Sequence, residues 1–384
     1  MADSRATILD NVQKLLPLIR EKARASELAR QPNDSVIEAA RNCGLFSLLV
    51  PKRYGGLEAD LDLLLEVGLL LGEADASTAW VLDFYIVHNW MFCQFPESFQ
   101  KVLFANRNYV LAPGMFSPTG KAVTVDDGYQ LNGSWQWGTG IVHADWVLAG
   151  ALQDTDQGPA MFWYALPRSD VEMVDTWQMS GMCATGSHDV AIHDKTVPLD
   201  RRVSSAEMRD GQAPGSTLHA NPLYSMPAMP VLSLGAALPC IGQAKGAVKE
   251  FSEQIRARYD FASLNRQVDR QSRQIRIAHA AIQAECAELL VRQVVREMIA
   301  LRAKAAPATR ARWGAQIAHA VHLARGAISE ICEAAGASSQ FLSNPLQRSL
   351  RDANTMSCHT VFDVELRYRS MGRSLFGLDP EGIY

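Results

Sequence analysis

The sequence predicts a mainly α-helical protein with a small antiparallel β domain in its middle. Apolar residues recur at helical spacing through about the first hundred residues, and they do so again from about Leu234 to the end. Between Val110 and Val203 the pattern changes to short alternating segments separated by Gly, Asp and Pro, which is typical of strands. We therefore expect three parts: an N-terminal helical domain over residues 1–109, a central β domain over 110–230 and a C-terminal four-helix bundle over 231–384.

Four helices are expected in the N-terminal part. The first covers residues 8–30, and the second follows "QPND", where Asn33 or Asp34 can cap its first turn. Residues 61–71 and 77–92 form the third and the fourth. The last of these is rich in aromatic residues and has no charged face, so we expect it to be buried.

The middle of the chain and its C-terminal part follow two other patterns. The segment "AVTVDDGYQLNGSW" predicts a β-hairpin with its turn at Asp-Asp-Gly, and "DWVLAGAL", "AMFWYALP" and "DVAIHDKTVP" predict further strands. Four long helical runs then follow with short connections, which favours an antiparallel bundle. They cover residues 236–259, 269–303, 310–336 and 352–371.

Composition and motifs exclude several classes of protein. The 384 residues are 48% hydrophobic and carry a net charge of −4 without long runs of like charge, so we expect neither nucleic acid nor a membrane as a partner. No stretch of about 18 uncharged apolar residues and no secretory signal occurs, which predicts a cytoplasmic protein. The seven cysteines are spread singly, and His319 and His322 have no further ligand in register, so no metal site is expected. No P-loop or G-x-G-x-x-G motif is present either.

Five segments in this order resemble the acyl-CoA dehydrogenase fold, and in detail its flavin-dependent monooxygenase branch. These enzymes are the oxygenase components of two-component aromatic hydroxylases, also called group D. The resemblance covers nearly the whole chain and implies reduced FAD or FMN as cofactor, a small aromatic substrate, a separate NAD(P)H–flavin reductase and a homotetramer. The segments are "LPLIREKARASELARQPNDSVIEAARNCGLFSLLVPKRYGG", "DASTAWVLDFYIVHNW", "YQLNGSWQWGTGIVHADW", "WQMSGMCATGSHDV" and "GASSQFLSNPLQRSLRDANT".

The resemblance implies a flavin site around "NGSWQWGTG". Trp135 or Trp137 would supply a flat wall for the isoalloxazine ring, and Thr139 would be the hydroxyl near the flavin N5, where a hydrogen-bond donor can stabilise a C4a-hydroperoxyflavin. Thr185 and Ser187 would help to hold the flavin, because Cys183 stands where relatives often have Arg. The alternative is an ordinary hairpin whose tryptophans fill the core.

The resemblance also implies catalytic residues. In the hydroxylases a histidine in the helix that ends in "VHNW" faces the substrate, which makes His88 the first candidate. Acyl-CoA dehydrogenases need a carboxylate base shortly after "RDA", but this chain has Thr360 there, with His359 beside it. Ser374 stands where we expect the second histidine of the phenol hydroxylases. Serine alone is no base near neutral pH. This favours a substrate that is electron-rich without ionising, such as an indole, or one that is oxygenated at a heteroatom.

An aromatic-lined substrate pocket is expected beside these residues, although each of its members could equally be core. Arg258 and the turn Gly336 to Phe341 could reach the cofactor of a neighbouring subunit, or Arg258 could be a solvated surface residue. The substrate-binding candidates are Phe84, Tyr85, His88, Trp90, Tyr224 and Met226.

The expected function is hydroxylation of an indole-like or phenolic substrate with reduced flavin and O2, through a C4a-hydroperoxyflavin. Two enzymatic alternatives stay open: an acyl-CoA dehydrogenase or oxidase with an unusual base, and a monooxygenase acting on N or S. A flavin-free structural or binding relative of the same fold is the alternative from another class.

Overall fold

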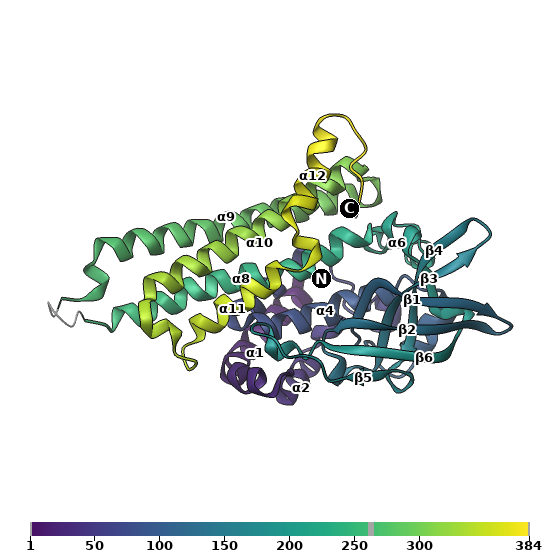
Figure 1. The fold of residues 1–384 in the computed structure, drawn as a ribbon, viewed down its shortest axis with the longest axis horizontal. Coiled ribbons are helices and arrows are strands. Elements are labelled where there is room, and N and C mark those ends of the chain that lie inside the picture. Colours follow the sequence, from purple (N-terminus) through teal and green to yellow (C-terminus); the bar gives the residue numbers. More distant parts are fainter. Residues whose placement is uncertain (1, 260–264, 383–384) are drawn as a thin grey trace.

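A computed structural model describes residues 2–259 and 265–382, and it confirms the mainly helical fold with a central sheet (Figure 1). Helices of the N-terminal part lie beside the sheet and behind it, while the C-terminal helices extend away as a long arm (Figure 1). The N-terminal helices are α1 (Ala2–Ala29), α2 (Asp34–Asn42), α3 (Leu61–Ala74), α4 (Ala76–Phe92) and α5 (Glu97–Leu103).

The N-terminal helices agree with the pattern of the sequence in most places. Asn33 caps α2, because its side chain accepts a hydrogen bond from the Ser35 N–H. All but one of the residues of α4 are buried, as its uncharged faces predicted. The short helix α5 was not expected, since seven residues show too little periodicity to be recognised.

The sheet is mixed, so the expectation of a purely antiparallel sheet was wrong at one pair of strands. The predicted hairpin is present, with Val125 opposite Gly128 across the turn. After β2 the chain crosses to the other side of β1, and β3 therefore runs parallel to β1. The strand order is β5-β6-β2-β1-β3-β4-β7. The strands are β1 (Gly114–Val125), β2 (Gly128–Gly138), β3 (Trp146–Thr155), β4 (Gly158–Pro167), β5 (Glu172–Val174), β6 (His188–Pro198) and β7 (Arg202–Ser204).

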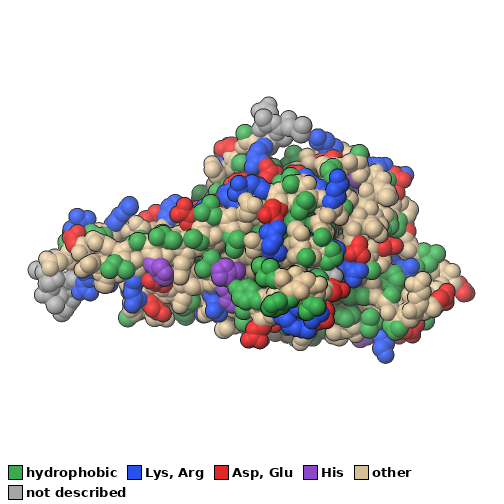
Figure 2. Space-filling model, turned by 90° about the horizontal axis from the view of Figure 1, so that it is seen from above, with side chains coloured by type: hydrophobic (Ala, Val, Ile, Leu, Met, Phe, Trp, Pro, Cys, Tyr) green, Lys and Arg blue, Asp and Glu red, His purple; other side chains and the backbone are tan. Residues whose placement is uncertain are grey.

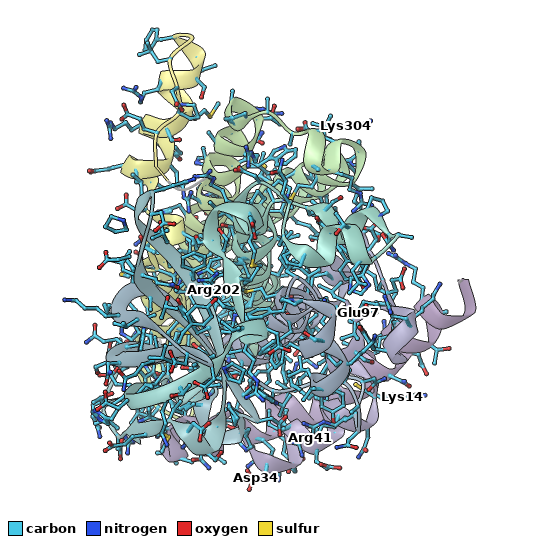
Figure 3. The ribbon with its side chains drawn as sticks, turned by 90° about the vertical axis from the view of Figure 1, so that its right-hand side faces the viewer. Lys14, Asp34, Arg41, Glu97, Arg202 and Lys304 are labelled. Atoms are coloured by element: carbon cyan, nitrogen blue, oxygen red, sulfur yellow. The ribbon has the colours of Figure 1, made fainter. Side chains whose placement is uncertain are left out.

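The guanidinium group of Arg202 on the edge strand β7 packs against two aromatic rings of the sheet. The guanidinium carbon of Arg202 lies 4.3 Å from the ring centroid of Tyr129 and 4.1 Å from that of Phe162 (Figure 3). Contacts of this kind attract the positive charge to the face of each ring. They stabilise the end of the molecule that carries the sheet.

The C-terminal helices form the bundle that was expected, with α10 in contact with α8, α9, α11 and α12. The last predicted helix is in fact two helices, because the chain turns after Ser357 and Asp363 caps a new helix by accepting the Leu366 N–H. Helices α6 (Ser205–Arg209) and α7 (Pro214–Leu218) connect the sheet to the bundle. The bundle helices are α8 (Ala228–Arg256), α9 (Gln271–Leu301), α10 (Pro307–Ala335), α11 (Pro345–Ser357) and α12 (Val364–Leu375).

Helix α8 lies at the centre of the molecule. In the part of the chain that the structure describes, it is the one helix long and apolar enough to cross a membrane, and 89% of its apolar window is buried inside the protein. It packs against α3 and α4 as well as against α10. Its apolar character is therefore that of a core helix.

Helix α4 buries a carboxyl group that has no hydrogen-bond partner among the described residues. Both oxygens of Asp83 are unpaired and its side chain is fully buried. It faces α3, where a Cβ on Gly68 would lie 2.7 Å from Asp83 Oδ2. Burial raises the pKa of Asp83 well above its ordinary value, because the apolar interior disfavours the charged form. Burial therefore favours the protonated, neutral form of Asp83 in the folded protein.

Replacing Asp83 by Asn should stabilise the protein at alkaline pH, and the gain should shrink as the pH falls. The folded protein keeps the proton of Asp83, whereas the unfolded chain loses it above a pKa of about 4. The free energy of unfolding of the wild type therefore falls by ~1.4 kcal/mol per pH unit as the pH rises toward the folded-state pKa of Asp83. The Asp83→Asn variant cannot ionise at this position and does not lose this stability. Thermal unfolding at about pH 5 and about pH 8 measures the difference, with Asp127→Asn in the exposed hairpin turn as control. Parallel pH curves for wild type and Asp83→Asn would contradict the prediction.

Candidate active site

Three hydroxyl groups meet at the end of β2 although they come from two segments of the chain. Thr139 Oγ1 lies 3.0 Å from Ser187 Oγ, and Ser187 Oγ lies 2.7 Å from Thr185 Oγ1. Thr185 Oγ1 in turn donates to the carbonyl of Met182 at 2.9 Å. All three hydroxyl side chains are buried. We call this chain of Thr139, Ser187 and Thr185 the hydroxyl relay.

The hydroxyl relay has one direction. The Met182 carbonyl can only accept, so the single hydrogen of Thr185 points at it. Ser187 must then donate to Thr185, and Thr139 must donate to Ser187. The lone pairs of Thr139 that face away from the relay are left as acceptors. The sequence suggested a donor at Thr139, whereas the relay makes this hydroxyl an acceptor toward any ligand.

The turn that carries Thr139 holds Trp137 in an unusual conformation. Trp137 has φ of +68° and its side chain is 58% exposed. Positive φ is uncommon for a bulky side chain and stores strain, which is often found at functional sites. The turn is fixed by Tyr85, whose hydroxyl donates to the Gly140 carbonyl at 2.5 Å. A Cβ on Gly140 would lie 2.3 Å from that hydroxyl, so glycine is required there.

Trp135 has a different environment from Trp137. It is 1% exposed, and its indole N–H donates to the Gly150 carbonyl at 2.7 Å. Its ring covers Gly120, where a Cβ would lie 2.1 Å from the ring. Trp135 therefore fills the core of the sheet, as the alternative for this hairpin proposed, and only Trp137 is available as a flat wall for a ligand.

His88 is buried and holds its imidazole in one tautomer. Its Nδ1 lies 2.7 Å from the Ala112 carbonyl, which can only accept, so Nδ1 carries the hydrogen and Nε2 carries a lone pair. Burial lowers the pKa of His88 to about 4, against the opposing effect of the Ala112 carbonyl. Nε2 faces β1, where a Cβ on Gly114 would lie 3.0 Å from it. His88 is thus a neutral hydrogen-bond acceptor near neutral pH.

Aromatic rings form a continuous row on both sides of His88, and this aromatic row joins α4 to the sheet and to the C-terminal helices. Ring centroids of Phe84 and Phe116 lie 5.4 Å and 5.7 Å from that of His88. Trp80 lies 4.6 Å from Phe84 and 5.6 Å from His359. The row also includes Trp163, 4.9 Å from Phe116. Trp80, Phe84 and His88 stand four residues apart on one face of α4, a helical spacing that the sequence already shows.

His359 lies at the other end of the aromatic row and has the opposite tautomer. Its Nδ1 accepts the Val361 N–H, which leaves the hydrogen on Nε2. Burial lowers the pKa of His359 to about 4. The row therefore contains one neutral histidine that accepts at Nε2 and one that donates at Nε2. The sequence pattern marked His359 only as a neighbour of Thr360.

Among the other candidates, three have their polar groups bound to the main chain, and the fourth, Met226, has a buried thioether. Tyr85, Trp90, Tyr224 and Met226 are buried, and the polar groups of the first three donate to main-chain carbonyls of Gly140, Leu223 and Leu49. Phe84 and His88 remain from the set proposed for the substrate.

Ser374 lies on α12, which projects from the bundle, and its hydroxyl donates to the Ser370 carbonyl (Figure 1). Among the described contacts none joins Ser374 to the aromatic row or to the hydroxyl relay. Its catalytic role therefore has no support from the described contacts, and His359 is the C-terminal residue that does meet the row.

Arg258 and the turn at residues 336–341 do meet. Arg258 donates to the Ser338 hydroxyl from the end of α8. A solvated Arg258 without partners was the other possibility. The two segments thus form one polar corner at the far end of the arm.

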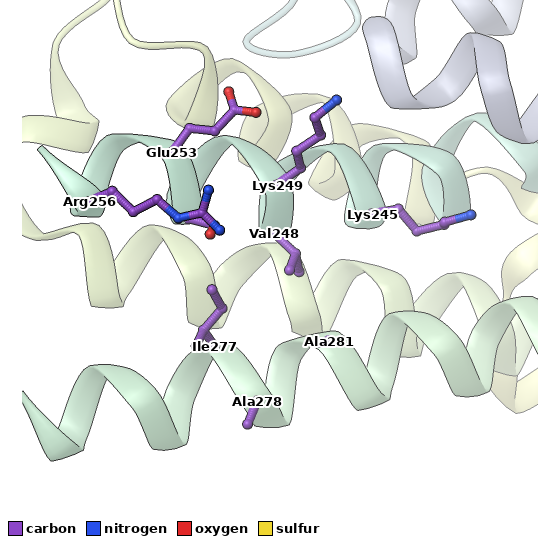
Figure 4. A pocket seen from close by; sticks show the side chains of 9 residues that line it. Lys245, Val248, Lys249, Glu253, Arg256, Ile277, Ala278 and Ala281 are labelled. Carbon is purple, nitrogen blue, oxygen red and sulfur yellow. The ribbon is translucent and has the colours of Figure 1, made fainter. Parts of the chain in front are cut away.

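A groove of about 540 Å³ lies on the arm between α8 and α9 (Figure 4). None of its lining residues belongs to the hydroxyl relay or the aromatic row. Long charged side chains of α8 surround an apolar floor that includes Val248, Ile277 and Ala278. The groove is open on the surface of the bundle. Its lining residues are far in the sequence from those of the candidate active site and are of a different kind.

Comparison with known proteins agrees with this architecture. Residues 234–364 match the family described as acyl-CoA dehydrogenase, C-terminal domain. The helices around a central sheet and the matched bundle define a protein of the acyl-CoA dehydrogenase fold.

Relatives with full-length similarity narrow the class. The flavin-dependent monooxygenase oxygenase subunit HsaA of Mycobacterium tuberculosis is 33% identical over 380 residues, 97% of this chain and 96% of the relative. The oxygenase component of an FADH2-dependent resorcinol hydroxylase from Rhizobium sp. is 28% identical over 393 residues, 98% and 96% of the two chains. XiaF from Streptomyces sp., solved with FADH2 and glycerol, is 30% identical with a TM-score of 0.92, covering 99% of this chain and 98% of its own.

The chain therefore belongs to the oxygenase components of flavin-dependent monooxygenases. It is an enzyme and its cofactor is a flavin. Relatives are halves of two-component hydroxylases that act on aromatic substrates, and the term oxygenase component implies a separate flavin reductase.

Proposed function

We propose that this protein hydroxylates a small aromatic substrate with reduced flavin and O2, and that the flavin ring binds at the end of β2 between Trp137 and the hydroxyl relay. The observation that carries the proposal is the acceptor hydroxyl of Thr139 beside the strained, exposed ring of Trp137. Reduced flavin carries a hydrogen on N5, and Thr139 offers a lone pair to it. Reduced flavin held there would supply the oxygen-transfer chemistry by reacting with O2.

His88 and His359 have complementary roles in this proposal. His88 Nε2 accepts a hydrogen from the hydroxyl or ring N–H of the substrate, which raises the electron density of the ring that is attacked. His359 Nε2 donates a hydrogen bond to an oxygen at the opposite end of the aromatic row. Both histidines are neutral at working pH, so neither brings a charge into the site.

The aromatic row favours a flat substrate. Trp80 lies at an ordinary aromatic distance from Phe84, and the rings of Phe84 and Phe116 lie at such distances from His88. Either an indole or a phenol presents the hydrogen that His88 can accept. Both flavins, FAD and FMN, fit the contacts described, since none of them involves the adenine end.

We propose that the protein is a homotetramer in which another copy of the chain covers the outer face of α9. Ile275, Ile282 and Leu289 recur every seven residues on this helix and are 60%, 58% and 54% exposed. Figure 2 shows hydrophobic side chains along the arm that the bundle forms. Apolar stripes of this kind are typical of helix–helix interfaces. Light scattering on the purified protein should give four times the mass of one chain, and a monomer would contradict the proposal.

The test of function mixes the protein and reduced flavin with O2 and a panel of indoles, phenols and thiophenes. We expect a hydroxylated product from at least one flat substrate, a transient flavin absorbance before reoxidation, and H2O2 when no substrate is present. Bleaching of oxidised flavin by an acyl-CoA would instead indicate a dehydrogenase. Failure to bind reduced flavin at micromolar concentration would indicate a flavin-free relative. The cytoplasmic location that the sequence predicts can be checked separately by cell fractionation.

A further inference from the structure

The loop that ends the hydroxyl relay rests on a buried carboxylate from a distant part of the chain. Asp352 on α11 accepts the Met182 N–H at 2.6 Å with one oxygen and the Ser77 hydroxyl at 2.9 Å with the other. Asp352 is 2% exposed. It therefore joins the start of α4, the loop before β6 and the bundle at a single point.

Met182 needs such a partner. Its backbone is left-handed, with φ of +56° and ψ of 25°, a conformation that costs a side-chain-bearing residue free energy. The loop also lies directly on α11, because a Cβ on Gly181 would be 2.2 Å from the Arg351 carbonyl oxygen. In this conformation the Met182 carbonyl receives both the Thr185 hydroxyl and the Trp177 indole N–H. Release of Met182 would remove the acceptor that sets the direction of the relay.

We propose that Asp352 is a positioning residue of the active site: by holding the Met182 N–H it fixes the carbonyl on which the hydroxyl relay ends, and thereby the acceptor orientation of Thr139. The inference rests on the proposed flavin site and deepens it. Asp352 does not touch any reacting group in this arrangement. It acts through Met182, Thr185 and Ser187.

The charge on Asp352 decides how well it performs this role. Both oxygens accept hydrogen bonds, and a proton on either of them would displace or weaken one of these bonds. Burial, then the charge of Asp75, raises the pKa of Asp352 to about 7, opposed by the Met182 N–H, the Ser77 hydroxyl and Arg348. The other charged groups nearby are Arg351 and Glu27, which pair with each other, and Cys183 on the loop carries a thiol. The carboxylate form is lost as the pH falls below about 7, which weakens the hold on Met182.

Hydrogen exchange and product analysis of the full-length protein test the proposal together. After correction for intrinsic rates, the protection of the segment that contains Met182 against hydrogen exchange should fall about fivefold from about pH 8 to about pH 6. This is the factor expected when one ordinary hydrogen bond is lost. The ratio of product to H2O2 should fall over the same range. Asp352→Asn keeps an oxygen for Met182 but cannot ionise, so both pH dependences should disappear.

Two further variants make the test specific. Ser77→Ala removes a hydrogen bond that favours the carboxylate, so both pH midpoints should move upward. Asp363→Asn leaves an α12 cap in place and should behave as wild type. Unchanged pH dependence in Asp352→Asn, or exchange that loosens without any change in the product ratio, would overturn the proposal. If no substrate is hydroxylated at any pH the proposed function fails, and the exchange data still decide whether Asp352 holds Met182.

Discussion

Replacing His88 by alanine should lower the yield of hydroxylated product about 100-fold while the flavin-loaded protein continues to consume O2. Positioned general bases contribute on the order of 10² to 10⁴ in rate, and alanine leaves nothing to accept the hydrogen of the substrate. The O2 that is consumed should appear as H2O2. Product and peroxide measured in the same reaction give the result.

The control for His88 is a histidine outside the aromatic row. His193 is exposed on the sheet, so His193→Ala should hydroxylate as the wild type does. Because the pKa of His88 is about 4, its contribution should stay constant between about pH 6 and about pH 8, and a pH effect there belongs to other groups. Parental yield from His88→Ala would show that the substrate binds elsewhere.

Replacing Thr139 by alanine should speed the release of H2O2 in the absence of substrate by about tenfold or more. The variant loses the acceptor proposed for the flavin N5–H, a bond whose loss in a buried site costs on the order of 1–3 kcal/mol. Thr139→Ser keeps a hydroxyl that can donate to Ser187 and should restore the wild-type rate. A peroxide assay after mixing reduced flavin and protein with O2 measures this.

The two variants should differ in one respect. His88→Ala should release H2O2 without substrate at the wild-type rate, because His88 lies in the aromatic row and not in the hydroxyl relay. Thr119→Ala, which changes a threonine on β1 that bonds the Ser134 carbonyl, should leave both assays unchanged. Equal peroxide release from Thr139→Ala and wild type would place the flavin away from β2.

Much of the candidate site could be predicted from the sequence through its resemblance to a family. His88, Thr139, Thr185 and Ser187 were all singled out, and the last three do lie together. The direction of their hydrogen bonds could not be predicted, since it depends on the Met182 carbonyl reached across the loop. The sequence predicted a donor role for Thr139, but it did not reveal that the hydrogen of this hydroxyl is directed to Ser187.

The two tryptophans show why strand periodicity was not enough. Trp135 and Trp137 stand two residues apart, so a regular strand would place both on one face. The pairing of β2 with β6 is irregular between Trp135 and Gly138, and the left-handed backbone at Trp137 turns its ring outward. One tryptophan is core and the other is surface for a reason that local sequence does not contain.

By itself the sequence determined most of the long helices, the hairpin and the mainly helical fold with a central sheet, because periods of 3.6 and 2 residues depend only on neighbours along the chain. Only the tertiary structure decided which of these side chains meet. It brought His359 to the aromatic row, left Ser374 on a projecting helix, and set Asp352 under Met182, 170 positions away in the chain. Such contacts follow from the way the bundle packs on the sheet, which no local pattern specifies.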